Sequence, residues 1–457
     1  MPFPPGIYRG AFCGGMLKGM RELLEQVQDI VADAPLPDKL LRVHQTFEGP
    51  KVTDLVGSTK VAVDRLVVNL DRGGTVAVGV GSRGIANLDV ITRATVDRLK
   101  ELGFEPFIFP AMGSHGGATA EGQLGVLESF GVTPEAMGVA FKATMEVAEI
   151  GRLEDGTPLC QDVNARAADA TLLISRIKPH TDFRSHLESG PSKMCVIGLG
   201  KRQGASMMHN GGVPAFQRYL APAARNYEAH TNFVGAVCLV ENAYDETAII
   251  TALTAAEVGL EPEAALLQTS KELMASIPFP VVDVLVIQQI GKDISGAGMD
   301  PNVTGRLMIP REPENFGGPD LATIAVLNLT EATHGNAAGL GFADVTTARV
   351  LSQVDWHVTY TNAITSGSFG MRRSQLPITV PDDRRALCVA LRGCTVPDQS
   401  LAKMVFIRDT LTLDTLWVSP TLRAEVQAHP RLEVLEEVSL SFDADGMMTN
   451  PWRLPRI

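Results

Sequence analysis

The chain has 457 residues, of which 45% are hydrophobic and 20% are charged, and its formal net charge is −12 at pH 7. This length exceeds what one ordinary hydrophobic core holds, so we expect two domains. The acidic balance argues against a nucleic-acid partner, because binding to phosphates requires a basic face.

Cysteine usage and hydropathy indicate the compartment. The six cysteines include no Cys-x-x-Cys pair, so neither a zinc knuckle nor an iron–sulfur motif is visible. The first 20 residues lack the uninterrupted apolar segment of a signal peptide, and no apolar run approaches the ~18 residues that a membrane helix needs. We therefore expect a soluble, cytoplasmic protein without a membrane partner.

Helical spacing and short apolar runs predict the following elements. In chain order we expect a helix at 20–32, a strand at 41–47, a helix within 51–67, a strand at 75–80, a helix at 88–102, a strand at 106–110, a helix at 119–130, strands at 170–174 and 232–240, and a helix at 262–275. Beyond a proline break at 278–280, strands are expected at 281–288, 324–329, 386–391 and 415–418, with a helical segment after Ala343.

Strands that alternate with glycine-rich loops and helices are typical of a largely parallel sheet covered on both faces. We therefore predict an α/β fold of two domains, each with such a sheet, divided at the proline break into residues 1–278 and 279–457. In open α/β sheets, ligands bind beyond the carboxyl ends of the strands. The loops that follow the predicted strands are the first candidates for a site.

Two of these loops carry one candidate residue each. In the loop GSRG, Arg83 could grip a carboxylate or phosphate with its guanidinium fork, or lie on the surface with its stem against apolar neighbours. In the loop GSHGG, His115 is sterically open and titrates near neutral pH, which suits proton transfer; a phosphate contact or plain exposure is the alternative. Because His180 recurs at the same sheet edge, we favour a functional role for His115.

The stretch from Ser175 to His209 holds the densest set of reactive side chains, including His180, His186 and Lys193. A neutral imidazole is the commonest metal ligand, and a desolvated lysine is a nucleophile. Alternatively, the lysines and arginines of this stretch form a basic patch for an anion, and His186 and His209 have no role. The residue types alone leave both interpretations open.

A fourth loop follows the predicted strand 281–288. Gln289 and Lys292 could orient a polar substrate there, and the glycine-rich continuation to Arg306 would allow a ligand to approach the backbone. A hinge between the domains is the alternative. Both interpretations can hold, because clefts between domains are favoured binding sites.

Several short motifs together resemble the lactate racemase family of nickel-pincer enzymes. They are GSHGG at 113–117, KPHTDF at 178–183, ESGPSKM at 188–194, GLGK at 198–201, and His209. The resemblance covers about residues 43–361 and implies a racemase or epimerase of a 2-hydroxy acid. It implies hydride transfer to the nickel-pincer nucleotide (nickel pyridinium-3,5-bisthiocarboxylic acid mononucleotide), supplied by cofactor-biosynthesis enzymes. The N-terminal domain would bind the cofactor and the C-terminal domain would close over the substrate, with the active site in the cleft between the domains.

The resemblance also implies roles for individual residues. Lys193 would tether the cofactor through a thioamide, Ser189, Gly190 and Ser192 would bind it next to that lysine, and His209 would ligate its nickel.

Substrate chemistry would involve residues from three further loops. His115 and His180 would form an acid/base pair, and Arg83, Gln289 and Lys292 would bind the substrate. A hydrogen that leaves the α-carbon as hydride leaves a planar keto acid, which can take the hydride back on either face. The hydroxyl proton must leave at the same time, so a base that titrates near the operating pH is needed on each side.

The sequence departs from the family pattern in the first loop. The family's Asp-x-Thr-Arg motif reads Val80-Gly81-Ser82-Arg83, so the aspartate contact to the cofactor is missing. The substrate is then a hydroxy acid or sugar acid whose tail could contact Met299, Trp356, Tyr360 or Asn362.

Two other functions remain open from the residues themselves. A divalent-metal-dependent hydrolase or lyase would use His115, His180 and His209 directly as ligands. A hinged binding protein for an anion or small molecule would bind without turnover, although such a protein has little need for histidines on several sheet-edge loops.

Overall fold

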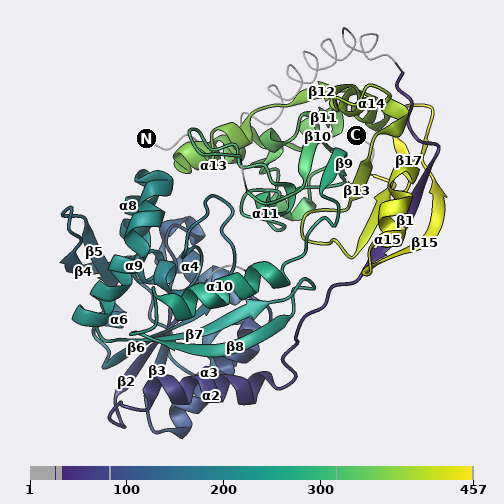
Figure 1. The fold of residues 1–457 in the computed structure, drawn as a ribbon. Helices are drawn as coiled ribbons and strands as arrows, with labels where there is room; N and C mark the ends of the chain where they lie inside the picture. The colour runs from purple at the N-terminus through teal and green to yellow at the C-terminus, as the bar shows by residue number, and fades with distance from the viewer. Residues whose placement is uncertain (1–25, 27–32, 82–83, 315, 455–457) are drawn as a thin grey trace. The chain divides into compact units, whose positions relative to one another are not determined.

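A computed structural model describes residue 26 and residues 33–81, 84–314 and 316–454. The chain forms two compact units (Figure 1). Residues 48–274 form the inserted unit, and residues 33–47 together with 275–454 form the split unit. The inserted unit ends at Met274, shortly before the expected boundary after residue 278. Residues 33–47, expected in the N-terminal domain, lie in the split unit.

The inserted unit is built on a five-stranded sheet. In spatial order, its strands are β3 (Glu105–Pro110), β2 (Thr75–Val80), β6 (Ala170–Arg176), β7 (Phe233–Glu241) and β8 (Thr247–Thr254). The first four run parallel, which confirms the predicted sheet type, and β8 adds an antiparallel edge strand next to β7. A hairpin of β4 (Val147–Arg152) and β5 (Pro158–Asp162) forms a separate small sheet.

Helices cover both faces of the five-stranded sheet (Figure 1). They are α2 (Leu55–Val67), α3 (Leu88–Glu101), α4 (Ala120–Glu128), α5 (Pro134–Met137), α6 (Val163–Arg166), α7 (Pro191–Lys193), α8 (Lys201–Asn210), α9 (Gly212–His230) and α10 (Glu261–Leu273). Val76, Val78 and Val80 of β2 point into one apolar core with α2 and α3, because alternate residues of a strand share a face. On the other face, α10 packs against β7.

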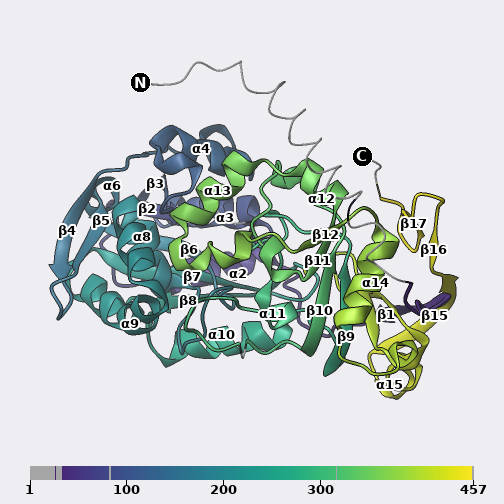
Figure 2. The same cartoon turned by 90° about the horizontal axis from the view of Figure 1, so that it is seen from above.

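The split unit contains an eight-stranded sheet (Figure 2). Its spatial order is β12 (Ile378–Val380), β11 (Val345–Thr347), β10 (Asp320–Val326), β9 (Val281–Ile287), β13 (Met404–Ile407), β14 (Thr415–Val418), β1 (Lys39–Gln45) and β15 (Leu432–Ser439). The strands from β12 to β13 are parallel, whereas β14, β1 and β15 pair antiparallel. The pairing of β1 with β14 and β15 assigns residues 33–47 to this unit. The remaining elements are α11 (Pro301–Thr304), α12 (Ala348–Gln353), α13 (Trp356–Thr365), α14 (Asp383–Gly393), α15 (Arg423–Ala428), β16 (Ser441–Phe442) and β17 (Met448–Asn450).

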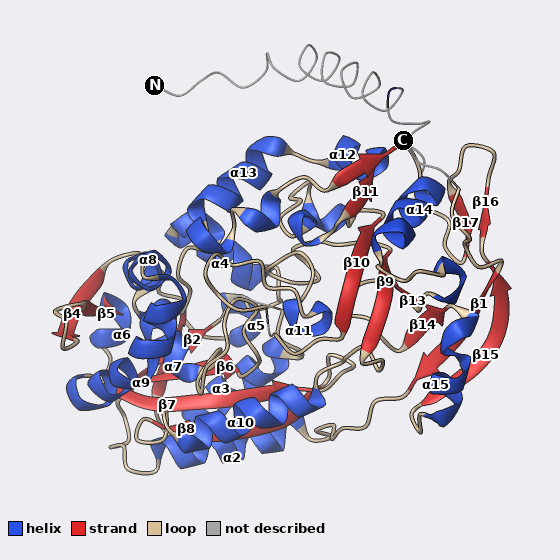
Figure 3. Cartoon of the chain, turned by 45° about the horizontal axis from the view of Figure 1, so that its top comes forward, coloured by secondary structure: helices blue, strands red, loops and turns tan. Residues whose placement is uncertain are grey.

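One predicted strand of this unit is wrong. Residues 386–391 lie in α14, which packs beside β10 and β11 (Figure 3). Asp382 caps this helix by accepting a hydrogen bond from the backbone N–H of Arg385 at 2.9 Å. The buried side chains of Ala386, Leu387, Ala390 and Leu391 then share one helical face, because residues four apart on a helix lie one turn apart.

Two further findings concern membrane spans and the cysteines. No helix in the described ranges is both long and apolar enough to cross a membrane. The five cysteines that the structure describes are buried free thiols: Cys160, Cys195, Cys238, Cys388 and Cys394.

Candidate active site

The loops after β2, β3, β6 and β7 lie at one edge of the five-stranded sheet, because these strands run parallel. The loop after β3 carries His115, and the loop after β6 carries His180 and leads into α7, which ends at Lys193. Arg83 follows β2 and lies outside the described residues. Both candidate catalytic histidines are therefore on loops of the same sheet edge.

A cluster around Phe216 of α9 brings three of the predicted site residues together. The Nζ atom of Lys193 lies 2.7 Å from Nε2 of His180. The imidazole of His180 stacks on Phe183 with ring centroids 4.3 Å apart, and Phe183 lies 4.9 Å from Phe216. His209 meets the same Phe216 ring edge-on at 5.5 Å, and Nζ of Lys193 lies 5.9 Å from its centroid. The amine of Lys193 and the imidazoles of His180 and His209 thus lie around the ring of Phe216.

Both ring nitrogens of His180 have a polar neighbour. The backbone N–H of Asp182 donates to Nδ1 at 3.1 Å, and Nζ of Lys193 lies 2.7 Å from Nε2, where the tautomer of the ring decides which atom donates. The Asp182 carboxylate lies 3.7 Å from Nδ1, beyond hydrogen-bond distance.

A buried carboxylate holds the backbone of His180. The backbone N–H of His180 donates to Oε2 of Glu188 at 2.7 Å, and the side chain of Glu188 is fully buried. The other oxygen, Oε1, accepts from the Lys271 ammonium at 2.7 Å. Because a hydrogen bond to an ionised partner is stronger than a neutral one, Glu188 ties the β6 loop to α10.

A second buried carboxylate holds the start of α7. Glu263 accepts from both the backbone N–H and the hydroxyl of Ser192, at 3.1 and 2.8 Å, and from the Gly259 N–H at 2.8 Å. Burial raises the pKa of Glu263, and these three bonds oppose that rise. A Cβ atom at Gly190 would lie 2.5 Å from Oε1 of Glu263, so this close approach requires glycine. The carbonyl of Ser189 accepts from the backbone N–H of Lys178 at 3.0 Å, which ties the two ends of the loop together.

His115 is held at the same sheet edge by its backbone. Its carbonyl oxygen lies 3.4 Å from Nε2 of Gln123 on α4, and its side chain is partly buried. The structure therefore places His115 on the expected loop, and its partnership with His180 stays a prediction.

The other candidate residues belong to the split unit. Gln289 donates to Oδ2 of Asp409 at 3.4 Å, and Nζ of Lys292 donates to the Gly296 carbonyl at 2.6 Å. Met299 is fully buried, whereas the other three candidates for the substrate tail lie on α13. A role for these residues beside the inserted unit stays a prediction.

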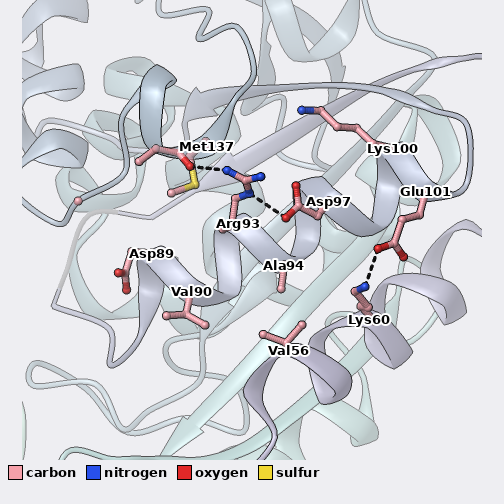
Figure 4. A pocket seen from close by; sticks show the side chains of 12 residues that line it. Val56, Lys60, Asp89, Val90, Arg93, Ala94, Asp97, Lys100, Glu101 and Met137 are labelled. Atoms are coloured by element: carbon pink, nitrogen blue, oxygen red, sulfur yellow. Dashed lines mark hydrogen bonds and ion pairs between the residues drawn. The ribbon is translucent and has the colours of Figure 1, made fainter.

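The inserted unit also has a groove of about 810 Å³, whose walls come from α2, α3 and α5 (Figure 4). Four of its charged side chains form two ion pairs: Lys60 with Glu101 at 2.6 Å, and Arg93 with Asp97 at 2.7 Å. Neither the candidate histidines nor Lys193 lines this groove. The chemistry that the sequence suggests is therefore not located there.

Within the described ranges, no group of three or more His, Cys, Asp or Glu side chains is arranged to hold a metal ion. His115, His180 and His209 are all described, and they do not form such a group. No model of a known protein family matches the chain, and a search of curated proteins finds no match either. The family resemblance therefore depends on the motifs themselves.

Several residues of the site were not assigned a role from the sequence. Phe183 and Glu188 lie within the motifs KPHTDF and ESGPSKM, so their proximity to His180 along the chain was a usable signal. Phe216 and Glu263 lie on helices far along the chain, where no local pattern separates them from ordinary buried residues.

Proposed function

We propose that this protein is a racemase or epimerase of a 2-hydroxy acid that uses a nickel-pincer nucleotide tethered to Lys193. The observation that carries the proposal is the 2.7 Å contact between Nζ of Lys193 and Nε2 of His180, with His209 against the same Phe216 ring. This cluster contains the candidate tether, one candidate acid/base and the candidate nickel ligand. Motifs that are separate in the sequence thus meet in one place.

The donor set of the cluster fits such a group. Lys193 offers an amine, whose uncharged form is the nucleophile needed for a thioamide bond. His209 offers an imidazole, a ligand type that suits nickel, and one protein ligand is enough when the cofactor brings its own donor atoms. A cofactor held by these residues would supply a reversible hydride acceptor for the α-hydrogen of the substrate.

Asp182 equips His180 for proton transfer in both directions. Its backbone N–H stabilises the tautomer whose Nδ1 is bare, and its carboxylate, 3.7 Å from Nδ1, stabilises a ring that carries a proton there. With the proton at Nδ1, Nε2 is free to take the hydroxyl proton of the substrate. The resulting imidazolium can return a proton from Nε2 to the keto oxygen, as the reverse reaction requires.

The remaining residues complete the proposal. His115 serves as the acid/base on the opposite face of the substrate, and Arg83 holds the substrate carboxylate with Lys292 and Gln289. This arrangement fixes the α-carbon relative to the reacting groups, which lowers the entropic part of the barrier.

The proposal includes the cellular compartment and the supply of the cofactor. The five buried free thiols suit a reducing cytoplasm, where the enzymes that make the cofactor would supply it.

Mass spectrometry of the intact protein tests the tether. The chain is produced together with cofactor-biosynthesis enzymes, as wild type and as Lys193→Ala. We expect an added mass and nickel in the wild type and no added mass in the variant. Lys51→Ala is the matched control, because Lys51 is 61% exposed in its side chain and pairs only with the surface residue Glu246.

The loaded wild type is then assayed for racemisation of aliphatic, aromatic, dicarboxylic and sugar hydroxy acids. Interconversion of the stereoisomers of at least one class is expected. A wild-type chain that carries neither adduct nor nickel rules out the proposed function. An adduct that persists in Lys193→Ala moves the tether to another residue.

A further inference from the structure

Lys201 is a fully buried lysine at the start of α8. Its ammonium donates to the carbonyl of Pro110 at 2.8 Å and to Oε1 of Gln123 at 2.5 Å, and it lies 3.8 Å from Oδ2 of Asp162. Burial lowers the pKa of Lys201 to about 8, and burial also raises the pKa of Asp162. These contacts connect the end of β3, α4 and the end of β5 to the first residue of α8.

The contact with Lys201 orients the amide of Gln123. A lysine side chain offers donors when charged, so the oxygen end of the Gln123 amide must face it. The amide nitrogen then faces the loop after β3, where it lies 3.1, 3.0 and 3.4 Å from the carbonyls of Met112, Gly113 and His115. Gln123 is itself fully buried. A single side chain therefore contacts three carbonyls of the loop that carries His115.

The same loop rests on the segment that carries Lys193 and His209. This segment is helical almost throughout, because a π-helical stretch (Met194–Leu199) connects α7 to α8. A Cβ atom at Gly113 would lie 2.7 Å from the Cβ of Ala205 on α8, so only glycine allows this approach. The loop and the helical segment are thus packed together and also joined through Gln123 and Lys201.

We propose that Lys201 and Gln123 form a strut that positions His115 relative to Lys193 and His209. Neither residue touches the substrate, so both are positioning residues. Lys201 fixes the amide of Gln123, and this amide fixes the carbonyls of the His115 loop against α8. The effect on turnover rests on the proposed function, whereas the effect on the loop does not.

The test compares wild type, Gln123→Glu and Lys201→Met in the full chain. Gln123→Glu keeps an oxygen for Lys201 but turns a second oxygen toward three carbonyls, which replaces attraction by repulsion. Lys201→Met removes the ammonium that holds the Gln123 amide and puts an apolar side chain of similar size in its place. Glu128→Gln is the matched control, because it exchanges a carboxylate and an amide at an exposed position of the same helix, α4.

Hydrogen exchange of the backbone amides is the first measurement. We expect several-fold faster exchange at residues 112–119 in both variants and unchanged exchange at 193–209. In the cofactor-loaded enzyme, we expect kcat to fall roughly 10- to 100-fold because His115 is misplaced. KM should stay within about 2-fold and nickel content should not change, a split that general loss of stability would not produce.

The possible outcomes test the strut and the proposed function separately. If both variants keep wild-type exchange in the 112–119 loop, or if Glu128→Gln lowers kcat equally, the strut is refuted. If the loaded wild type racemises no hydroxy acid, the proposed function fails, and the exchange data alone decide whether the strut exists.

Discussion

Replacement of Glu188 by Gln tests how firmly the His180 loop is held. Four donors surround this buried carboxylate: the backbone N–H groups of His180 and Ser185, the Lys271 ammonium and the Arg184 guanidinium. A glutamine has one acceptor oxygen and one NH₂ group. Either orientation therefore removes one charge-assisted bond and turns a donor against another donor.

The expected loss of stability follows from the missing charge-assisted bond and from the donor left without an acceptor. A hydrogen bond to a charged group contributes about 1.5–3 kcal/mol, and a buried polar group without a partner costs about 1–3 kcal/mol. Lys271 keeps 30% of its side chain exposed, so water offsets part of its loss. We expect Glu188→Gln to lower the free energy of unfolding of the inserted unit by about 3 kcal/mol.

Native-state hydrogen exchange of β6 and β7 measures this change, because their most protected amides report the opening of the whole unit. Glu261→Gln is the control, since the Glu261 side chain is 79% exposed and lies 3.4 Å from the exposed His186. It should change stability by less than about 0.5 kcal/mol. A Glu188→Gln variant as stable as this control would show that the carboxylate does not hold the loop.

The remaining predictions concern titration and catalysis. Between pH 8 and 10.5, Lys201 is deprotonated in the folded chain but still protonated in the unfolded chain. The free energy of unfolding therefore rises with pH across this range, by up to about 3 kcal/mol relative to that of Lys201→Met. Denaturant titrations of both proteins across this range measure the difference; a flat difference curve would mean that the ammonium is not buried. Asp182→Asn keeps the backbone N–H but removes the carboxylate that stabilises a charged His180, so kcat should fall roughly 10-fold while the Lys193 adduct remains. A pH profile of kcat for Asp182→Asn that matches that of the wild type would exclude this role of the carboxylate. His115→Ala and His180→Ala should each abolish racemisation and retain nickel, as measured by interconversion of the substrate stereoisomers and by metal analysis; full activity in either variant would remove that histidine from the acid/base pair.

The sequence predicted the framework of the inserted unit well, because its signals are local. Buried runs such as 75–80 and 170–174 become β2 and β6, and the glycine-rich loops after them lie at one sheet edge, as parallel strands require. The segment 386–391 was misread for the same reason, since a short apolar run has no period long enough to separate strand from helix. The aspartate at 382 was the available cue for a helix start.

Long-range packing was beyond sequence reasoning. Nothing near Phe216 in the chain indicates that its ring lies between two imidazoles and an amine. The strut is likewise a long-range contact, because Gln123 and Lys201 come from two separate elements, α4 and α8. A buried lysine is not distinguishable from an exposed one until the neighbouring elements are in place.

The pairing of β1 has a consequence for synthesis of the chain. His44 in this strand contacts Asp414, 370 residues later. At a translation rate of 5–20 residues per second, the strand waits roughly 20 to 70 s on the ribosome before its neighbours exist. Leu40, Leu41 and Val43, which end up without any solvent exposure, stay uncovered during that time while residues 48–274 can already fold. The nascent chain therefore exposes an unpaired apolar strand, which chaperones would have to shield until the last strands emerge.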